Sequence, residues 1–596
     1  MYLWDQGDLN KKQEDAIYTK GSVFLTACPG SGKTRTLTYK IAYELSRLEN
    51  EKSYVIAITY TNRAADEIHE RIEGLGIDVS QLWIGTIHSF CLEWILKPYG
   101  VYNENLKYGF RVIDSHEREK ILESLCENYR YITHWNCDFY ITETGYVLGC
   151  QDEWKHKDLN SILSQYFQIL TEKRELDFEL ILYYAFELIK NEPAISLILS
   201  KIFRFILIDE YQDTKSIQYS ILAAILNSGG LKTNSFIVGD PNQAIYESLG
   251  GYPMSVSDFE KLSGTDMVKL ELSENYRSSR RIVDYFGNYN IYATNIIASS
   301  KDRDFKSNIS FDCNVKKVEL EEKIVKLIKY NIEVLGITPS ELCVIAPQWT
   351  SLASMTRKLV SLLPEYDFDG PGMVPFARDI ENFWYKLSKV ALTSASPNMY
   401  IRRLRWAGDV LTEMEQFGID TSQLSRKYIL RESNSISITE VDGLKYLTEF
   451  FDVFFKRINV NYQLYEQLTQ HYNAFFDSSQ ARIERLKNDG AEFIGDISTF
   501  RKVFKNRTGI TVSTMHGVKG AEFDVVIAYA LLEGMVPHFS DPKGQESATK
   551  MLYVIGSRAR KNLYLISESE RFNVRRDEYK PTQVLANCQF LYDPIT

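Results

Sequence analysis

Ser22-Val23-Phe24-Leu25-Thr26 is followed directly by Ala27-Cys28-Pro29-Gly30-Ser31-Gly32-Lys33-Thr34, and this stretch decides the fold. The first five residues form a short apolar and β-branched run, which predicts a buried strand. The next eight form a glycine-rich loop, and Arg35 begins a pattern typical of a helix. A strand, a glycine-rich loop ending in Lys-Thr and a helix together predict a phosphate-binding loop.

The residue types of this loop suit a nucleotide. Glycines let the backbone curl so that amide groups point at phosphate, and the helix N-terminus adds its positive dipole end. Lys33 can reach the β- and γ-phosphates, and the Thr34 hydroxyl can bind Mg²⁺. Ala27 stands where the motif has its first glycine, a difference of one methyl group. The predicted nucleotide contacts of the loop are Ala27, Cys28, Pro29, Gly30, Ser31, Gly32, Lys33, Thr34 and Arg35.

A second buried strand ends in two acidic residues. Phe205-Ile206-Leu207-Ile208 is apolar throughout, and Asp209-Glu210 follows at its carboxyl end. A nucleoside triphosphatase needs one carboxylate to hold the metal and another to orient the attacking water. We therefore predict that Asp209 binds Mg²⁺ with Thr34 and that Glu210 is the catalytic base.

The remaining chain repeats the strand–loop–helix pattern, which predicts parallel sheets covered by helices, an α/β fold. Two stretches, roughly 95–195 and 380–500, have helical periodicity and few strand signals, and they predict helical insertions. Further strands are predicted at 54–59, 203–208, 236–238, 342–345, 510–513, 525–528 and 563–566.

Composition limits the protein class. A length of 596 residues suggests roughly four structural units at about 150 residues each. The net charge of −10 argues against a surface that binds phosphate everywhere, so any nucleic-acid track must be local. The eight cysteines form no C-x-x-C pair, which is atypical of a zinc site or a disulfide framework. No basic leader and no apolar run of roughly 20 residues is found, so we expect a cytoplasmic protein without membrane contacts.

Asp209-Glu210-Tyr211-Gln212-Asp213 is similar to the D-E-x-Q-D signature of UvrD/Rep-type superfamily 1 helicases. Other stretches resemble the motifs of this family, in its order and over nearly the whole chain. They are 9–17, 59–65, 85–90, 238–246, 274–278, 514–523 and 552–559.

The resemblance implies two RecA-like domains that bind ATP and Mg²⁺ between them, each interrupted by a largely helical insertion. The first domain would comprise 1–94 and 196–265, with 95–195 inserted. The second would comprise 266–379 and 501–596, with 380–500 inserted.

The resemblance also assigns roles to individual residues. In the first domain, Gln13 would read adenine and Gln243 would couple hydrolysis to movement. In the second, Tyr276 would stack on adenine, Glu522 would hold the ribose, and two arginines would neutralise charge on the γ-phosphate. The implied catalytic set is Lys33, Asp209, Glu210, Gln243, Arg277 and Arg558.

A nucleic-acid strand can be held without sequence preference by aromatic stacking and polar contacts to phosphate. The stacking candidates are Tyr60, Phe90 and Tyr246, and the polar candidates are Thr61, Asn62, Arg63, His88 and His516. After Tyr246, the family commonly has a tryptophan and an arginine that engage DNA, whereas this chain reads Glu247-Ser248-Leu249. One stacking platform is therefore absent from the pattern.

The leading hypothesis is an ATP-dependent helicase that translocates on single-stranded DNA or at single/double-strand junctions, with 3′→5′ polarity implied by the resemblance. An alternative is an ATP- and DNA-binding regulatory subunit that gates a separate nuclease or defence partner and unwinds little. A third, an ATPase acting on protein or metabolites, fits the phosphate loop but leaves the strand-contacting motifs unexplained. Repair, replication, plasmid maintenance and phage defence all remain open as pathways.

Overall fold

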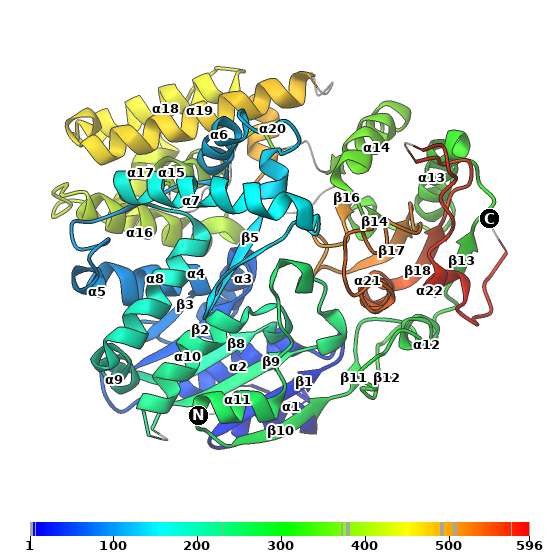
Figure 1. The fold of residues 1–596 in the computed structure, drawn as a ribbon, viewed down its shortest axis with the longest axis horizontal. Helices are drawn as coiled ribbons and strands as arrows, with labels where there is room; N and C mark the ends of the chain where they lie inside the picture. Colours follow the sequence, from blue (N-terminus) through cyan, green and yellow to red (C-terminus); the bar gives the residue numbers. More distant parts are fainter. Residues whose placement is uncertain are drawn as a thin grey trace. The chain divides into compact units, whose positions relative to one another are not determined.

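The computed structural model describes residues 4–5, 7–230, 232–370, 374–376, 382–488, 494–504, 509–573 and 575–594. The chain forms two compact units: unit 1 comprises Met1–Lys317 with Met515–Thr596, and unit 2 comprises Val318–Thr514. Two six-stranded parallel sheets confirm the predicted α/β class (Figure 1). No helix in the described ranges has the length and apolar character that crossing a membrane requires.

The first sheet lies in unit 1, and all its strands run parallel. Its order places β9 between β1 and β8, so the segments that follow these three strands emerge at one edge of the sheet. These segments contain the glycine-rich loop, the Asp209-Glu210 pair and Asp240. In spatial order the strands are β10 (Met267–Leu272), β1 (Ser22–Ala27), β9 (Asn234–Gly239), β8 (Phe203–Asp209), β2 (Tyr54–Thr59) and β3 (Leu82–Thr86).

Alternating side chains of this sheet enter two separate cores. In β2, Val55 and Ala57 join one cluster and Ile56 joins the other, because successive side chains of a strand point to opposite faces. The first cluster includes residues of α1 (Lys11–Tyr18), α2 (Lys33–Leu45) and α3 (Asn62–Gly74). The second includes residues of α8 (Phe178–Asn191) and α10 (Ser216–Ser228).

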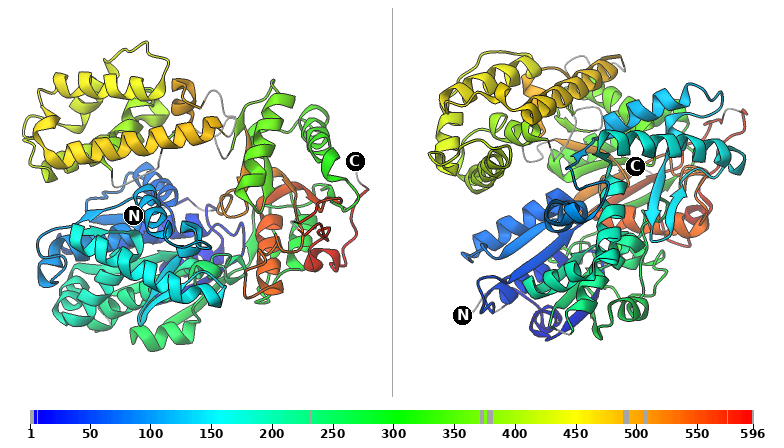
Figure 2. Two further views of the ribbon diagram at one scale, coloured as in Figure 1. Left: turned by 45° about the horizontal axis from the view of Figure 1, so that its top comes forward. Right: turned by 60° about the vertical axis from the view of Figure 1, so that its left-hand side comes forward.

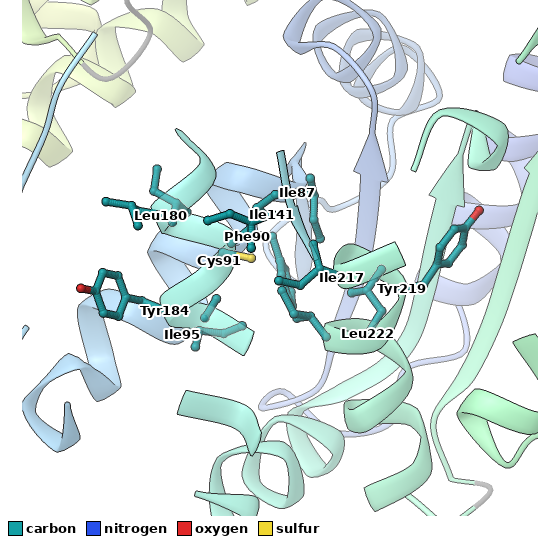
Figure 3. Packing of buried hydrophobic residues seen from close by; sticks show 14 of the residues in the cluster. Ile87, Phe90, Cys91, Ile95, Ile141, Leu180, Tyr184, Ile217, Tyr219 and Leu222 are labelled. Atoms are coloured by element: carbon teal, nitrogen blue, oxygen red, sulfur yellow. The ribbon is translucent and has the colours of Figure 1, made fainter. Parts of the chain in front are cut away.

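The predicted insertion at 95–195 contributes to the second of these cores. Figure 3 shows Cys91, Ile141, Leu180 and Ile217, which come from four different elements, in one apolar cluster. The prediction of a helical insertion missed a β-hairpin and a short two-stranded pairing. The elements after β3 are α4 (Ile87–Phe90), η1 (Cys91–Leu96), α5 (Lys97–Tyr99), β4 (Arg111–Val112), α6 (Ser115–Cys126), β5 (Phe139–Thr142), β6 (Gly145–Leu148), α7 (His156–Lys173), β7 (Glu175–Leu176), α8 and α9 (Pro193–Ile202).

The rest of unit 1 contains helix α21 (Gln545–Arg558), which packs against α12 (Arg280–Gly287) and ends where β18 (Ala559–Ile566) begins. Strands β13, β18 and β17 of the second sheet belong to unit 1 and pair in that order, and strands β14, β16 and β15 belong to unit 2. The other elements of this part are α11 (Val256–Ser263), β11 (Glu274–Asn275), β12 (Ile297–Ala298), β13 (Ile309–Asp312), β17 (Phe523–Ala528) and α22 (Gln583–Ala586).

Unit 2 contains a helical part with an aromatic core in which Trp384 packs against Phe451 and Phe455. Its helices are drawn from light green to orange in Figure 2. Helices therefore fill the described part of the predicted 380–500 insertion; residues 380, 381 and 489–493 lie outside the described ranges. The elements of unit 2 are α13 (Leu320–Lys329), β14 (Leu342–Ala346), α14 (Trp349–Leu362), β15 (Phe368–Asp369), α15 (Phe383–Ala391), α16 (Tyr400–Gln416), α17 (Arg426–Asn434), α18 (Gly443–Arg457), α19 (Glu466–Asn488), α20 (Ile497–Lys502) and β16 (Ile510–Thr514).

Candidate functional site

The predicted phosphate loop runs from Ala27, the last residue of β1, to the first turn of α2. Gly30 and Gly32 have φ angles of +69° and +80°, which is the left-handed region that favours glycine. A Cβ at Gly30 would lie 2.5 Å from the Cβ of Arg277. A Cβ at Gly32 would lie 2.6 Å from Nε2 of Gln13. The two glycines therefore allow two other predicted nucleotide contacts to approach the loop.

Lys33 and Thr34 are the first two residues of α2, whose first amide groups have no acceptor within the helix. This arrangement suits an anionic phosphate. Burial raises the pKa of the Cys28 thiol to about 12, so Cys28 adds no negative charge to the loop. Arg35 lies one residue further along the helix and pairs with Asp8 at 2.8 Å.

The two predicted catalytic acids stand at the end of β8. Glu210 has φ 53° and ψ 49°, a left-handed conformation that costs a non-glycine residue about 1–3 kcal/mol and is found mostly at functional sites. Its Oε1 lies 2.8 Å from Nζ of Lys33, and its Oε2 accepts a hydrogen bond of 2.5 Å from Gln212. The predicted base and the predicted phosphate-binding lysine are therefore ion-paired with each other.

The chemistry of Asp209 fits the predicted Mg²⁺. Burial raises the pKa of this carboxyl group, Glu210 adds to the rise, and Lys33 opposes it. A divalent cation would stabilise the carboxylate form. Within the described ranges, no group of three or more His, Cys, Asp or Glu residues could hold a metal ion. Mg²⁺ at nucleotide sites commonly uses one or two side chains together with phosphate oxygens and water, and Asp209 with Thr34 matches that requirement.

Gln13 and Tyr276, the predicted adenine contacts, both bind the loop. Gln13 donates from Nε2 to the carbonyl of Ser31 at 2.9 Å, while its Oε1 accepts from the amide of Asn10. The Tyr276 amide donates to the carbonyl of Gly30 at 2.8 Å, and its hydroxyl accepts from Asn10 Nδ2 at 2.7 Å. Tyr276 is 42% exposed, so this residue is accessible to a base.

The two predicted arginine fingers have different partners. Arg277 donates from Nε to Oε2 of Glu522 at 2.6 Å and from Nη1 to the carbonyl of Ser557 at 2.9 Å. Arg558 is buried and donates from Nη2 to Oε1 of Gln243 at 2.7 Å. Burial lowers the pKa of Arg558 to about 9, with Arg277 contributing, so its guanidinium stays charged at neutral pH. Gln243 and Arg558, each predicted to act in hydrolysis, are therefore in direct contact.

Glu522, the predicted ribose contact, is engaged by arginines at both carboxylate oxygens. Oε2 accepts from Arg277, and Oε1 accepts from Nη1 of Arg560 at 3.3 Å. Burial raises the pKa of Glu522, but these arginines outweigh it and lower the pKa overall. Glu522 is therefore an anion, and a ribose hydroxyl would share it with two cations.

Three of the predicted strand contacts form an aromatic row. The ring centroids of Tyr60 and Tyr246 are 5.0 Å apart, and those of Tyr246 and His516 are 5.1 Å apart. Tyr60 is 41% exposed. Burial lowers the pKa of His516, so its imidazole is neutral at physiological pH. The row offers an exposed ring to a base, which fits the predicted stacking.

The prediction that Phe90 stacks on a nucleic-acid base is wrong. The Phe90 side chain is 0% exposed and packs against the rings of Trp83 and Phe203. A ring enclosed in a core cannot stack on a nucleic-acid base, so Phe90 is a core residue in this structure. Its sequence neighbour His88 packs edge-on against Phe178, and burial lowers the pKa of its imidazole to about 4.

The other polar candidates lie at the start of α3. Thr61 caps this helix by accepting a hydrogen bond of 3.2 Å from the amide of Ala64. Thr61 and Asn62 are both exposed, so they remain available to phosphate oxygens. The side chain of Arg63 lies outside the described part of the structure.

Lys519 and Asp213 lie in two of the quoted motifs, but sequence reasoning gave neither a role. Nζ of Lys519 lies 2.5 Å from Oδ2 of Asp213 and donates to the carbonyl of Gln243 at 2.6 Å. The same ammonium lies 5.2 Å from the centroid of the Tyr246 ring. Lys519 thus joins the D-E-x-Q-D motif to the segment that carries both Gln243 and Tyr246.

Comparisons with known proteins agree with this geometry. Residues 9–263 match the model of the UvrD/REP helicase N-terminal domain, and residues 410–570 match that of the UvrD-like helicase C-terminal domain. The ATP-dependent DNA helicase PcrA of Staphylococcus epidermidis is 23% identical in an alignment that covers 96% of this chain and 85% of PcrA. PcrA of Staphylococcus aureus is 23% identical in an alignment that covers 94% of this chain and 83% of PcrA. The chain therefore belongs to the UvrD/Rep family of ATP-dependent DNA helicases.

Proposed function

We propose that this protein is an ATP-driven motor that moves 3′→5′ along single-stranded DNA. Membership of the family supports ATP-dependent action on DNA, and the polarity is taken from the resemblance to this branch of helicases. The observation that carries the proposal is the 240–246 segment, which contacts the candidate ATP site at one end and belongs to the aromatic row at the other.

The 240–246 segment connects the residues predicted to act in ATP hydrolysis with the residues predicted to bind the DNA strand. The Gln243 side chain contacts Arg558, and its backbone carbonyl accepts from Lys519. Tyr246 follows three residues later, and its ring packs against that of Tyr60 in the row. A change in the Arg558–Gln243 contact would therefore be transmitted through a few residues to the surface on which a base stacks.

The chain's own residues would prepare the reaction as follows. Bound MgATP supplies the γ-phosphate that is transferred to water. Lys33 would turn from Glu210 to the phosphates, and the carboxylate of Glu210 would then be released to orient water. Arg277 and Arg558 would stabilise the charge that develops on the transferred group.

The test is made on the purified chain. We expect ATPase activity that single-stranded DNA stimulates, and a signal from a 5′-end fluorophore that appears later on longer strands. If the delay appears only with a 3′-end fluorophore, the proposed polarity is wrong. ATPase activity that no single strand stimulates would favour an enzyme acting on protein or metabolites.

The regulatory-subunit alternative is favoured by one observation. Ser248 and Leu249 are exposed on η7 (Glu247–Leu249), where the family pattern has the DNA-engaging tryptophan and arginine. This difference suits a protein that unwinds poorly by itself. The comparisons give no support for a nuclease partner, and an unwinding assay with and without co-purifying proteins separates the two functions.

Ser248→Trp is expected to tighten single-strand binding. Stacking of a base on an aromatic is worth roughly 1–3 kcal/mol, so the dissociation constant should fall by about tenfold. Fluorescence anisotropy with a labelled oligonucleotide measures the change. Ser257→Trp is the matched control, because Ser257 is an exposed serine on α11, a helix that packs against α10 and β10. Equal gains from both variants, or no gain from Ser248→Trp, would show that position 248 offers no stacking site.

A further inference from the structure

Glu247, which directly follows the aromatic Tyr246, forms the centre of a charge cluster in which its own side chain and that of Lys550 are buried. Its Oε1 lies 2.9 Å from Nζ of Lys550, and its Oε2 lies 2.5 Å from Nζ of Lys543. The side chains of Glu247 and Lys550 are only 8% and 1% exposed. Lys550 also pairs with Glu546, one turn earlier on α21, at 2.7 Å. Neither Glu247 nor Lys550 has a place in the hydrolysis mechanism described above.

Lys550 lies on the face of α21 that meets the 240–247 segment. Three polar contacts follow this face: Lys550 with Glu247, Tyr553 with Asp240 at 3.2 Å, and Arg558 with Gln243 at 2.7 Å. Positions 550, 553 or 554, and 557 or 558 recur on one side of a helix. Lys550 and Arg558 are therefore about 12 Å apart along a single rigid element, at a rise of about 1.5 Å per residue.

The contact between Glu247 and Lys550 constrains the helix strongly. Two buried charges that are paired leave an uncompensated charge when one of them is removed, which is far more disruptive than the loss of a surface pair. Burial lowers the pKa of Lys550, but Glu546 and Glu247 outweigh it and raise the pKa, so the ammonium is charged. Glu546 belongs to α21 itself and cannot fix this helix against another segment. Glu247 can do so, because it lies outside the helix.

We propose that Glu247 is a positioning residue for ATP hydrolysis, which holds Lys550 and thereby sets where α21 presents Arg558 to Gln243 and the γ-phosphate. This inference rests on the proposed function, in particular on the role given to Arg558. The proposal also gives a role to the segment after Tyr246. The tryptophan and arginine of the family pattern are absent there, and Glu247 forms an ion pair that orients α21.

The first test is Glu247→Gln, which removes the charge with little change of shape. We expect kcat of the DNA-stimulated ATPase to fall by about tenfold, since a small misplacement of a catalytic group is costly, while KM for ATP changes by less than about twofold. Glu546→Gln is the matched control. It removes the other acid that pairs with Lys550 and should leave kcat within about twofold of the unmodified protein. An equal loss in both variants would overturn the proposal.

The decisive measurement combines Glu247→Gln with Arg558→Ala. If Glu247 acts by placing Arg558, the Glu247→Gln substitution should have no further effect on kcat once Arg558 is absent. Phosphate release at high enzyme concentration makes the slow turnover measurable. A tenfold loss in both backgrounds, or no loss in either, would overturn the proposal. Normal turnover of Arg558→Ala alone would instead refute the arginine-finger role within the proposed function.

A double variant shows whether a loss of kcat in Glu247→Gln results from misfolding. Glu247→Gln leaves the Lys550 ammonium partly uncompensated, whereas Glu247→Gln with Lys550→Gln removes both charges. We expect the double variant to unfold at a temperature closer to that of the unmodified protein and still to show the loss of kcat. Recovery of full turnover in the double variant would show that Glu247 only neutralises Lys550, and the positioning role would be wrong.

Discussion

ATP hydrolysis by the Lys33→Ala variant is expected to be at least about 100-fold slower than by the unmodified chain, the scale on which charges that stabilise a transferred phosphoryl group act. The structure adds a second reason. Lys33 is the principal cation that lowers the pKa of Glu210 against the effect of burial, so its loss favours protonation of the predicted base. Steady-state phosphate release in the presence of single-stranded DNA measures the change.

Lys326→Ala is a suitable control for Lys33→Ala. Lys326 is an exposed lysine of α13 that pairs with Glu322 on the same helix. It should leave turnover unchanged, because surface pairs of this kind contribute little. Circular dichroism of the Lys33→Ala variant establishes that the fold is retained. Turnover close to normal in a folded Lys33→Ala protein would refute the assignment of the phosphate loop.

Central strands could be predicted from the sequence because both of their faces are buried. The predicted 54–59 strand coincides with β2 (Tyr54–Thr59), in which every residue after Tyr54 is buried. Strands β3 and β10 were missed, and both lie at the edges of their sheet. In β10, exposed Lys269 and Glu271 interrupt the apolar run, so the pattern of a buried parallel strand is lost.

The hairpin in the first insertion could have been found. The residues of β5 and β6 are mostly aromatic or β-branched, and the two strands are joined by the two-residue loop Glu143-Thr144. Each strand has only four residues, and the long helical periods around them dominated the interpretation. The helical periodicity of the 380–500 stretch matches the helices found among its described residues, because its amphipathic helices are long.

The candidate site could be predicted where chemistry depends on neighbours in sequence. The loop from Ala27 to Thr34 and the pair Asp209-Glu210 each follow directly after a buried strand. An apolar run in the sequence shows where such a strand ends, so the positions of these residues could be predicted. Contacts between distant segments could not be predicted. Nothing in the spacing indicates that Lys519 would meet Asp213, or that the Phe90 ring would be enclosed while the Tyr60 ring is exposed.

Replacement of Arg277 or Arg558 by alanine is expected to lower kcat much more than it weakens ATP binding. An arginine finger is needed mainly when charge develops on the γ-phosphate, so its loss affects the transition state more than the bound ground state. We expect a loss of about 100-fold or more in kcat, within the range known for such residues. Binding of a non-hydrolysable ATP analogue, measured by fluorescence, should change by less than about tenfold.

The two arginines allow this prediction to be tested twice. Arg558 is buried, so Arg558→Ala leaves a cavity and requires a check of thermal unfolding, whereas Arg277 keeps a 12% exposed side chain. Arg558→Lys preserves the charge but lacks the planar fork that binds Gln243, so its turnover should lie between those of the alanine variant and the unmodified chain. If nucleotide affinity falls in parallel with kcat in both alanine variants, the arginines are ordinary binding residues. The Arg558–Gln243 contact would then not be the link by which hydrolysis affects Tyr246, and another contact of the 240–246 segment would have to transmit the change.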